Sequence, residues 1–398
     1  MSQRSVAVLG ATGSVGEATL AVARNHPDRL RVSVLAAQGT RPARLAELAR
    51  EFRPDRVIVA SADRAAALGG ELPDGVRLTC GDQALLDAVG TGDIDLVVTA
   101  IVGAAGLQPA AAALAAGADL ALANKEAMVA AGPVLRRLAA ASGSSILPID
   151  SEHAAIHQAL RAGRPEEVRR LVLTASGGPF LDRDPATLET ATPAEATAHP
   201  TWNMGAKISV DSATLMNKGL ELIEASYLFD VAGSRIDIVI HPQSLVHSIV
   251  EFRCGNGIAQ ISANDMQYPI QYALSYPERW SRPAGSASTH LTELLQAASR
   301  LEFRQVDRGL FPAPSLARAA LARGGGAPAA LNAANEIAVD AFLSGGVPFT
   351  AIVPVVAGVL ERHDRQAGGG DPETVDEALA WDSWGRSHAR EVLAPFGG

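Results

Sequence analysis

The sequence of 398 residues has few cysteines, few aromatic residues and no excess of positive charge. Its two cysteines, Cys80 and Cys254, belong to no CxxC motif or Cys/His cluster, which excludes a disulfide framework and a zinc–thiolate site. The 34 basic and 43 acidic residues give a formal net charge of −9, so no global basic field attracts nucleic acid or an anionic membrane. We therefore expect a cytoplasmic protein with neither nucleic acid nor membrane as a partner.

The sequence also lacks a convincing membrane segment. Residues 96–118 carry no charge and are long enough to span a bilayer, but they are mostly small residues and include Gln108-Pro109. This composition favours a strand, a loop and a helix. The N-terminus lacks the long apolar stretch and cleavage site of a secretory signal, so we expect mature protein there.

What the first 150 residues do have is a repeated alternation of short apolar runs and helical stretches. Apolar runs of this length, separated by helices, are typical of a parallel sheet that is covered on both faces. The pattern predicts a Rossmann-like, doubly wound α/β domain over residues 1–150. The predicted strands are Val6–Leu9, Val32–Ala36, Arg56–Val59, Leu96–Ala100, Leu120–Ala123 and Ile146–Ile149.

The pattern of predicted strands and helices changes after residue 150. Strands are expected at 168–175, 236–240, 248–252 and 257–261, with one strong helix at 212–229, which predicts a mixed α+β domain over 151–275. Residues 276–288 are rich in Ser, Pro, Gly and Arg, so we expect a linker over 276–310. Helical segments at 315–323, 329–343, 350–362 and 372–392 predict a small C-terminal helical domain over 311–398.

The first predicted strand runs into Gly10-x-x-Gly13-x-x-Gly16 and then into a helix. Glycines at these places allow a tight turn and close approach of the backbone to a pyrophosphate at the helix N-terminus. The alternative is a Gly-rich turn without a ligand. The second strand ends without the carboxylate that an NAD site needs, and Arg41 follows it, which favours NADP(H) unless Arg41 is only a solvated surface charge.

Two groups of polar residues at and after the end of the first domain pattern are candidate binding residues. Asp150 and Glu152 stand at i and i+2 at the end of a predicted strand, so they should share a face and bind Mg²⁺ or Mn²⁺, unless they belong to a polar loop that caps a helix. Asn217, Lys218, Glu221 and Glu224 share one helix face, although a surface ion pair would explain Lys218 as well.

Two loops complete the set of candidate sites. Residues 199–205 cluster a His, a Trp and a Met around Pro and Gly, which is typical of a mobile lid, although a plain connecting loop is the alternative. Residues 176–179, Ser-Gly-Gly-Pro, expose backbone N–H groups and a hydroxyl after a strand, which suits a phosphate, although a simple turn is commoner.

Taken together, these segments resemble the 1-deoxy-D-xylulose 5-phosphate reductoisomerase family over essentially the whole chain. The resemblance rests on GATGSVG (10–16), AIVGAAGLQP (100–109), LANKE (122–126), PIDSEH (148–153), SGGPF (176–180), HPTWNMGAKISVDSATLMNKGLE (199–221), IHPQSLVHS (240–248) and LNAANE (331–336). The family's usual Gly-Lys/Arg-Asn after the second strand is replaced here by Gln38-Gly39-Thr40-Arg41, and a Cys expected after Pro312 is Ala313.

The resemblance implies an NADPH- and divalent-metal-dependent rearrangement and reduction of 1-deoxy-D-xylulose 5-phosphate to 2-C-methyl-D-erythritol 4-phosphate in non-mevalonate isoprenoid biosynthesis. It implies a homodimer whose middle domain supplies most of the contact. The implied metal ligands are Asp150, Glu152 and Glu221. The implied catalytic residues are these three with Lys125 and His199.

The resemblance also implies a set of binding residues. Those for the substrate, a sugar phosphate, are Lys125, Ser151, Glu152, Ser176, His199, Trp202, Met204, Ser212, Asn217, Lys218, Glu221 and His247, with Ser176, Ser212, Asn217 and Lys218 on its phosphate. Those for the cofactor are Thr12, Gly13, Ser14, Val15, Gly39, Arg41, Asn124, Glu126 and Gly205.

Two other functions fit parts of the sequence. Another NADP-linked Rossmann dehydrogenase, such as a semialdehyde dehydrogenase, needs an activated Cys, and neither Cys80 nor Cys254 lies in a nucleophile signature. A non-catalytic NADP-sensing module is the other alternative, but it would give no function to three carboxylates and a Lys.

Overall fold

The computed structural model describes residues 3–202, 204–282, 290–365 and 370–396. The chain forms two compact units, and each unit is assembled from several segments of the sequence. The first unit contains Met1–Ala127, Val134–Ala154 and Asp265–Ser288. The second contains Met128–Pro133, Ala155–Asn264 and Thr289–Gly398. The predicted domain boundaries at 150, 275 and 310 stay predictions.

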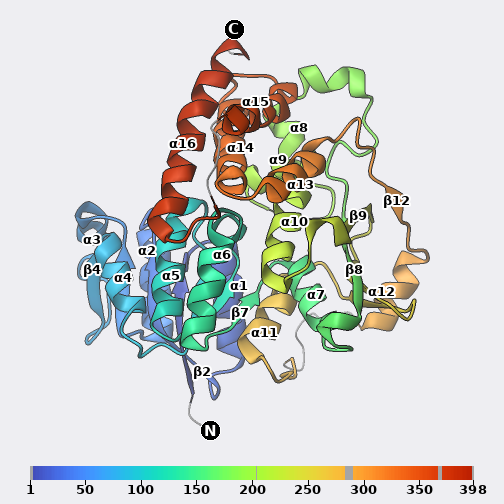
Figure 1. Cartoon of the computed structure of the whole chain (residues 1–398). Coiled ribbons are helices and arrows are strands. Elements are labelled where there is room, and N and C mark those ends of the chain that lie inside the picture. Colours follow the sequence, from blue (N-terminus) through green and yellow to red (C-terminus); the bar gives the residue numbers. More distant parts are fainter. Residues whose placement is uncertain (1–2, 203, 283–289, 366–369, 397–398) are drawn as a thin grey trace. The chain divides into compact units, whose positions relative to one another are not determined.

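The first unit is built on a parallel sheet of seven strands in the order β4-β3-β2-β1-β5-β6-β7, with helices on both faces (Figure 1). The predicted doubly wound fold is confirmed. The strands are β1 (Arg4–Leu9), β2 (Leu30–Ala37), β3 (Arg56–Val59), β4 (Arg77–Cys80), β5 (Leu96–Thr99), β6 (Asp119–Leu122) and β7 (Ile146–Pro148). The helices are α1 (Ser14–Asn25), α2 (Pro42–Phe52), α3 (Ala62–Leu68), α4 (Asp82–Val89), α5 (Leu107–Ala115), α6 (Lys125–Ser142) and α11 (Gln267–Ser275).

The order of the strands places the ligand-binding edge. From β1 the chain proceeds outward to β4 and then returns to β5 on the other side of β1. In doubly wound sheets, ligands commonly bind outside the carboxyl ends of the strands at such a reversal. Buried apolar side chains on the strands and on their covering helices form one core around this sheet. The ends of β1 and β5 are therefore where the strand order leads us to expect a ligand.

The second unit contains a mixed sheet of five strands in the order β11-β10-β8-β9-β12. The pair β8–β9 is parallel, and the pairs β10–β8, β10–β11 and β12–β9 are antiparallel. The strands are β8 (Val168–Ala175), β9 (Ile236–Ile240), β10 (Val246–Phe252), β11 (Gly257–Ile261) and β12 (Arg304–Gln305). The predicted α+β organisation of this part is confirmed.

Helices pack around this sheet and continue into a helical C-terminal region, where α14 packs against α15 and α16. The helices are α7 (Ser151–Leu160), α8 (Pro193–Thr197), α9 (Ala206–Ala213), α10 (Met216–Phe229), α12 (Leu291–Ala298), α13 (Ala313–Arg323), α14 (Ala327–Leu343), α15 (Ile352–Arg365) and α16 (Val375–Leu393). Alanines and larger apolar residues of α9, α10, α13, α14 and α15 share one buried cluster. The predicted helical C-terminal region is confirmed.

Three sequence predictions need correction. The single helix expected over 212–229 is two helices, because Leu215 has a φ of 57° and ends the helical path between α9 and α10. The predicted linker over 276–310 contains α12 and β12, and its residues 283–289 lie outside the described residues. The sheet has an additional strand, β4, which pairs with β3 at the edge.

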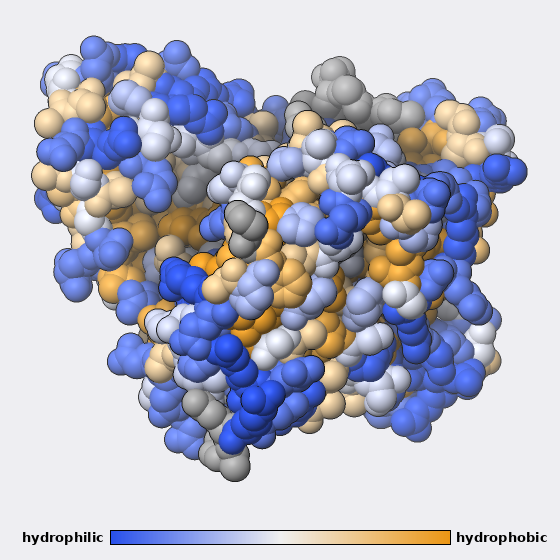
Figure 2. Space-filling model, turned by 90° about the horizontal axis from the view of Figure 1, so that it is seen from above, coloured by the Kyte–Doolittle hydropathy of each residue, from blue (hydrophilic) through white to orange (hydrophobic). Residues whose placement is uncertain are grey.

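One face of the molecule shows both hydrophilic and hydrophobic areas (Figure 2). On the face shown in Figure 2, hydrophobic areas are bordered by hydrophilic residues. Within the described residues, no helix combines the length and the apolar character needed to cross a membrane. The large hydrophobic side chains that are most exposed are Val102, Ile258, Leu291, Leu295, Leu301, Phe303 and Phe396.

Candidate active site

The turn between β1 and α1 allows very close backbone approach. Gly10 has a φ of 89°, and a Cβ there would lie 2.5 Å from the carbonyl oxygen of Ala100. A Cβ on Gly16 would lie 2.2 Å from the carbonyl oxygen of Gly10. Helix α1 begins at Ser14 without a side-chain cap, so its first N–H groups face outward at the positive end of the helix dipole. This turn, which includes Thr12, Gly13, Ser14 and Val15, has the geometry of a phosphate cradle.

The end of β2, next to β1 in the sheet, carries Gly39 and Arg41. Gly39 is buried with a φ of 83°, and a Cβ there would lie 2.9 Å from Cβ of Arg64. Arg41 is exposed and immediately precedes α2. Both residues follow the carboxyl end of the strand where the sequence predicts the NADP(H) 2′-phosphate contact. That contact and the alternative of a solvated Arg41 stay predictions.

Asn124 organises the carboxyl end of β6. Its Oδ1 accepts a hydrogen bond of 2.6 Å from the backbone N–H of Ala127, which caps α6. Its Nδ2 donates to the carbonyl oxygens of Ile101 and Gly103, the latter at 2.8 Å. One buried amide therefore fixes the loop after β5 to the start of α6. The next residues, Lys125 and Glu126, are also buried.

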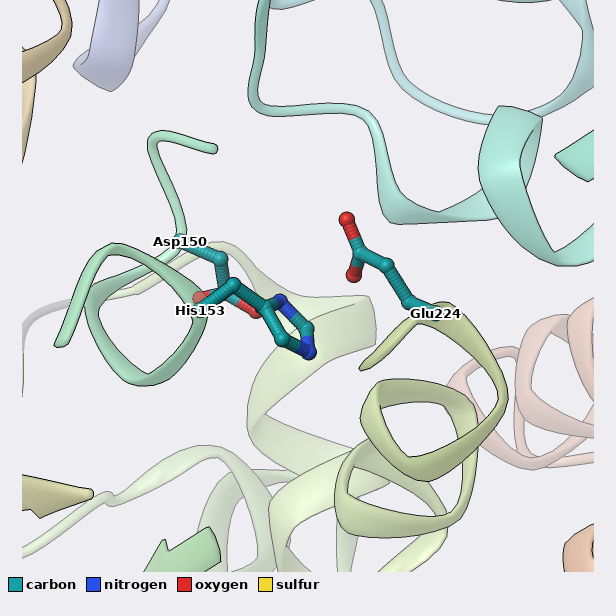
Figure 3. Close-up of side chains that lie close together, drawn as sticks. All are labelled: Asp150, His153 and Glu224. Atoms are coloured by element: carbon teal, nitrogen blue, oxygen red, sulfur yellow. The ribbon is translucent and has the colours of Figure 1, made fainter. Parts of the chain in front are cut away.

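Lys125 and Asp150 form a pair at the carboxyl ends of β6 and β7. Lys125 Nζ lies 2.9 Å from Asp150 Oδ2, and the side chains are 8% and 16% exposed. His153 Nδ1 lies 3.5 Å from the same oxygen, and Figure 3 shows the Asp150 and His153 side chains next to each other at the start of α7. Figure 3 also labels Glu224, a residue of α10 in the second unit. Ser151 Oγ donates a hydrogen bond to Glu152 Oε2.

The strand argument for Asp150 and Glu152 was wrong. Strand β7 ends at Pro148, and Glu152 lies in the first turn of α7. The alternation of side chains along a strand therefore does not apply to these two carboxylates. Sequence reasoning also gave no role to His153. Its signal was the i, i+3 spacing from Asp150, which brings side chains together at a helix start.

Glu221 in the second unit is fully buried and accepts two hydrogen bonds. Asn217 Nδ2 donates to its Oε1 at 2.6 Å, and Lys218 Nζ donates to its Oε2 at 2.5 Å. The side chains of Lys218 and Glu221 are 5% and 1% exposed. The alternative of a surface ion pair is therefore wrong for Lys218 and Glu221, because both side chains are buried.

The turn after β8 lies against the end of α9. Gly177 and Gly178 have φ values of 91° and 70°, so this turn depends on glycine. A Cβ on Gly178 would lie 2.4 Å from the carbonyl oxygen of Ser212. Ser176 Oγ accepts a hydrogen bond of 3.1 Å from the N–H of Gly178. The structure thus brings the Ser176 turn and the Ser212 backbone together.

His199 connects the predicted lid to the same turn. Its Nδ1 accepts backbone hydrogen bonds from Thr201 at 3.3 Å and Trp202 at 3.0 Å, so Nε2 carries the proton and donates to Ser176 Oγ at 2.9 Å. The Trp202 ring lies 6.3 Å from that of buried His247, measured between centroids. Gly205 precedes α9, Met204 is half-buried, and residue 203 of this predicted lid lies outside the described residues.

Comparison with known proteins agrees with these features. Residues 6–132 match a family model described as 1-deoxy-D-xylulose 5-phosphate reductoisomerase, and residues 146–229 and 261–388 match two models of DXP reductoisomerase C-terminal domains. A reductoisomerase of this name from Xanthomonas campestris is 50% identical over 398 residues, which cover 99% of this chain and 98% of the relative. The chain belongs to the 1-deoxy-D-xylulose 5-phosphate reductoisomerase family.

Other reductoisomerases are similar over nearly their whole length. The relative from Thermomicrobium roseum is 48% identical over 389 residues, covering 98% of this chain and 97% of its own. The solved reductoisomerase from Zymomonas mobilis, in complex with NADPH, has a TM-score of 0.89 and 38% identity, covering 98% of this chain and 99% of its own. A reductoisomerase in complex with NADPH, fosmidomycin and magnesium has a TM-score of 0.90 and 41% identity, covering 99% of this chain and 100% of its own.

Membership of the reductoisomerase family decides against the two alternative functions. A semialdehyde dehydrogenase would need a cysteine nucleophile in the cofactor-binding unit, where Cys80 ends the edge strand β4. Cys254 is exposed in the turn between β10 and β11, where hydrogen bonds from Asn256 lower the pKa of its thiol. Cys254 lies outside the cofactor-binding unit, and Cys80 lies at the edge of the sheet, three strands from β1.

Proposed function

We propose that this chain converts 1-deoxy-D-xylulose 5-phosphate and NADPH to 2-C-methyl-D-erythritol 4-phosphate and NADP⁺ with a divalent cation. The observation that carries the proposal is the similarity, over nearly the full chain, to reductoisomerases solved with NADPH and with magnesium. The test is oxidation of NADPH, followed by its absorbance, in the presence of 1-deoxy-D-xylulose 5-phosphate. Turnover that stops with a chelator and resumes with Mg²⁺ or Mn²⁺ supports it, and no turnover under any of these conditions contradicts it.

NADPH fits the first unit. The β1–α1 turn offers uncapped N–H groups at a helix N-terminus, and Gly10 and Gly16 let the backbone of this turn pack closely against Ala100 and against itself. We assign the cofactor phosphates to Thr12, Gly13, Ser14 and Val15, and the 2′-phosphate to Gly39 and Arg41. Asn124 and Glu126 of the first unit, together with Gly205 of the second, complete the proposed cofactor set.

Mg²⁺ or Mn²⁺ fits the carboxylates that the family resemblance assigns. Asp150 and Glu152 offer oxygen atoms from the start of α7, and Glu221 offers oxygen atoms from α10; hard divalent cations prefer such ligands. When bound, the cation polarises the substrate carbonyl, and NADPH supplies the hydride. Lys125, already paired with Asp150, brings a positive charge and an N–H donor to the same place.

The second unit supplies the proposed phosphate contacts. Ser176 and Ser212 bring hydroxyls from a glycine turn and from the end of α9, and Asn217 and Lys218 follow in the first turn of α10. Contacts to a phosphate lie far from the reacting carbons, so their binding energy serves to orient and enclose the substrate. His199 fixes the Ser176 hydroxyl, and we assign enclosure of the substrate to Trp202, Met204 and His247. Ser151 is assigned to the substrate's oxygens.

We also propose that the protein is a homodimer in a reducing cytoplasm. Strand β11 is an edge strand with an exposed residue Ile258, and α12 exposes Leu291 and Leu295 in the same unit. Apolar side chains on an open strand edge favour association with a second copy. Cys80 and Cys254 are both free thiols, as a reducing compartment maintains. Light scattering that gives only a monomer of 41.2 kDa at micromolar concentration would contradict the dimer.

A further inference from the structure

The motif LNAANE lies within α14, far along the chain from every residue assigned above, and contains a polar side chain that is completely buried. Asn335 is 0% exposed on the side of α14 that faces an apolar cluster. A buried amide in such surroundings is stable only when it is hydrogen-bonded. Asn335 Nδ2 donates to Asp211 Oδ1 at 2.7 Å, across 124 residues of sequence.

Asp211 is itself a buried charge whose two oxygens are both engaged. The residue is 1% exposed, and its Oδ2 lies 3.0 Å from Nζ of Lys207, one turn earlier in α9. The carboxylate is thus neutralised from its own helix and hydrogen-bonded from α14. A buried carboxylate held on both sides tolerates little movement, because any displacement leaves an oxygen without a partner.

The apolar contacts between α9 and α14 do not provide this restraint by themselves. Val210 and Ala213 of α9 pack in the same cluster as Leu331 and Ala334 of α14. Contacts between apolar side chains have no fixed direction, so several relative positions of α9 and α14 would be close in energy. A hydrogen-bonded polar pair is satisfied in only one relative position of the two helices. The hydrogen bond between Asn335 and Asp211 therefore fixes the register of α9 on α14.

The register of α9 matters because Ser212 follows Asp211 directly. The carbonyl of Ser212 lies against Gly178 in the turn that carries Ser176. Thr214 Oγ1 bonds back to the carbonyl oxygen of Asp211 at 3.2 Å and accepts the N–H of Met216 at 3.2 Å, so the start of α10 is tied to the same point. A shift of α9 would move the Ser212 hydroxyl and the first turn of α10 together.

We propose that Asn335 is a positioning residue for phosphate recognition, acting through Asp211 to hold the end of α9 at the Ser176 turn. The inference rests on the phosphate contacts in the proposed function, and it adds a residue that touches neither substrate nor cofactor. The predicted effect falls mainly on substrate affinity, because the proposed phosphate contacts Ser212, Asn217 and Lys218 follow Asp211 most closely, whereas the proposed metal ligand Glu221 lies one turn further along α10.

The experiment compares Asn335→Ala with Asn332→Ala. Asn332 is the same residue type on the same helix and is equally buried, but its Nδ2 donates to Glu336 Oε1 at 3.0 Å within α14. For Asn335→Ala we expect a rise of about ten-fold in both KM for 1-deoxy-D-xylulose 5-phosphate and the calorimetric Kd for inorganic phosphate, the size of one charge-assisted hydrogen bond. The kcat and the KM for NADPH should change less than about two-fold, and Asn332→Ala should leave all four constants unchanged.

A rescue variant separates positioning from general damage. Asn335→Asp alone places two carboxylates face to face and should raise both phosphate constants further. The double variant Asp211→Asn with Asn335→Asp exchanges donor and acceptor and should restore phosphate affinity to within a few-fold of the wild type. Failure of this rescue, with the double variant folded, would overturn the inference.

Ser212→Ala distinguishes failure of the inference from failure of the proposed contacts. If Ser212→Ala raises the Kd for phosphate and Asn335→Ala does not, the positioning role is wrong and the phosphate set stands. If Ser212→Ala leaves that Kd unchanged, the assigned phosphate set is wrong and the role of Asn335 falls with it. A loss of thermal stability in Asn335→Ala without any change in phosphate affinity would show that the pair is only structural.

Discussion

Replacing Gly16 by Ala tests the phosphate cradle of the first unit most directly. The added Cβ would lie 2.2 Å from the carbonyl oxygen of Gly10 and 2.8 Å from the backbone of Ala11. These are backbone atoms, so no side-chain rotation relieves the clash, and the β1–α1 turn must open. Because Gly10 also packs against the carbonyl of Ala100, the opening displaces the turn from the end of β5.

Two opposing contributions set the free-energy cost of Gly16→Ala. Overpacking in a tight site costs about 1–3 kcal/mol, and Ala in place of Gly inside a helix returns up to about 1 kcal/mol. If about 1.4 kcal/mol of the net cost appears as lost NADPH affinity, the Kd rises about ten-fold. We therefore expect weaker NADPH binding in a fluorescence titration, with a modest fall in the thermal midpoint.

Gly13→Ala is the matched comparison in the same turn. Its Cβ would lie 3.2 Å from the carbonyl oxygen of Gly10, a contact that a shift of a few tenths of an ångström relieves, and its φ of −80° suits Ala. The loss of affinity should be clearly smaller than for Gly16→Ala. Equal NADPH affinities in Gly16→Ala and the wild type would refute the argument that close backbone approach builds this site.

Three further predictions concern charge. Glu221→Gln leaves the buried Lys218 ammonium facing a neutral amide, so we expect a stability loss of up to about 3–5 kcal/mol and collapse of turnover, and near-normal turnover at limiting Mn²⁺ would remove Glu221 from the metal site. NADPH should be preferred to NADH and Arg41→Glu should shift the preference toward NADH; equal kcat/KM for both cofactors in the wild type would contradict this. Burial lowers the pKa of His157 from 6.5 to about 4, so the unfolded state binds the proton first as pH falls. The unfolding free energy should therefore decrease by about 1–3 kcal/mol from pH 7 to pH 4, and urea denaturation should show a flatter pH dependence for His157→Gln.

Local patterns predicted most of the fold. Apolar runs gave the bounds of β3, β8, β9 and β11 as the structure has them. Strand β4 was missed because Arg77–Cys80 is a half-buried edge strand with only one large aliphatic residue, Leu78, and thus no apolar run. The break at Leu215 was missed because the hydrophobic periodicity continues through it, and a positive φ at Leu has no sequence signal.

The candidate site likewise contains one part that the sequence predicts and another that it does not. The glycine turn before α1 is encoded in consecutive residues, so its position between a predicted strand and a predicted helix favours a phosphate site. The pair Asn335–Asp211 depends on the packing of two helices, and the pair His199–Ser176 depends on the path of a loop. The hydrophobic periodicity of one segment contains no information on contacts with segments that are distant in the sequence. Sequence reasoning singled out the segments that contain His199 and Ser176 but not the contact between them, and it gave Asn335 no role although the quoted motif LNAANE includes this residue.

The return of the chain to the first unit at Asp265–Ser288 has a consequence for synthesis. Helix α11 supplies Ile270, Ala273 and Leu274 to the core around the parallel sheet, and each is at most 1% exposed. A nascent chain that has reached residue 150 therefore holds all seven strands but not the helix that packs against α1, β6 and β7. On the ribosome this core can close only after more than a hundred further residues have emerged, and a fragment cut at residue 150 should expose apolar surface and aggregate.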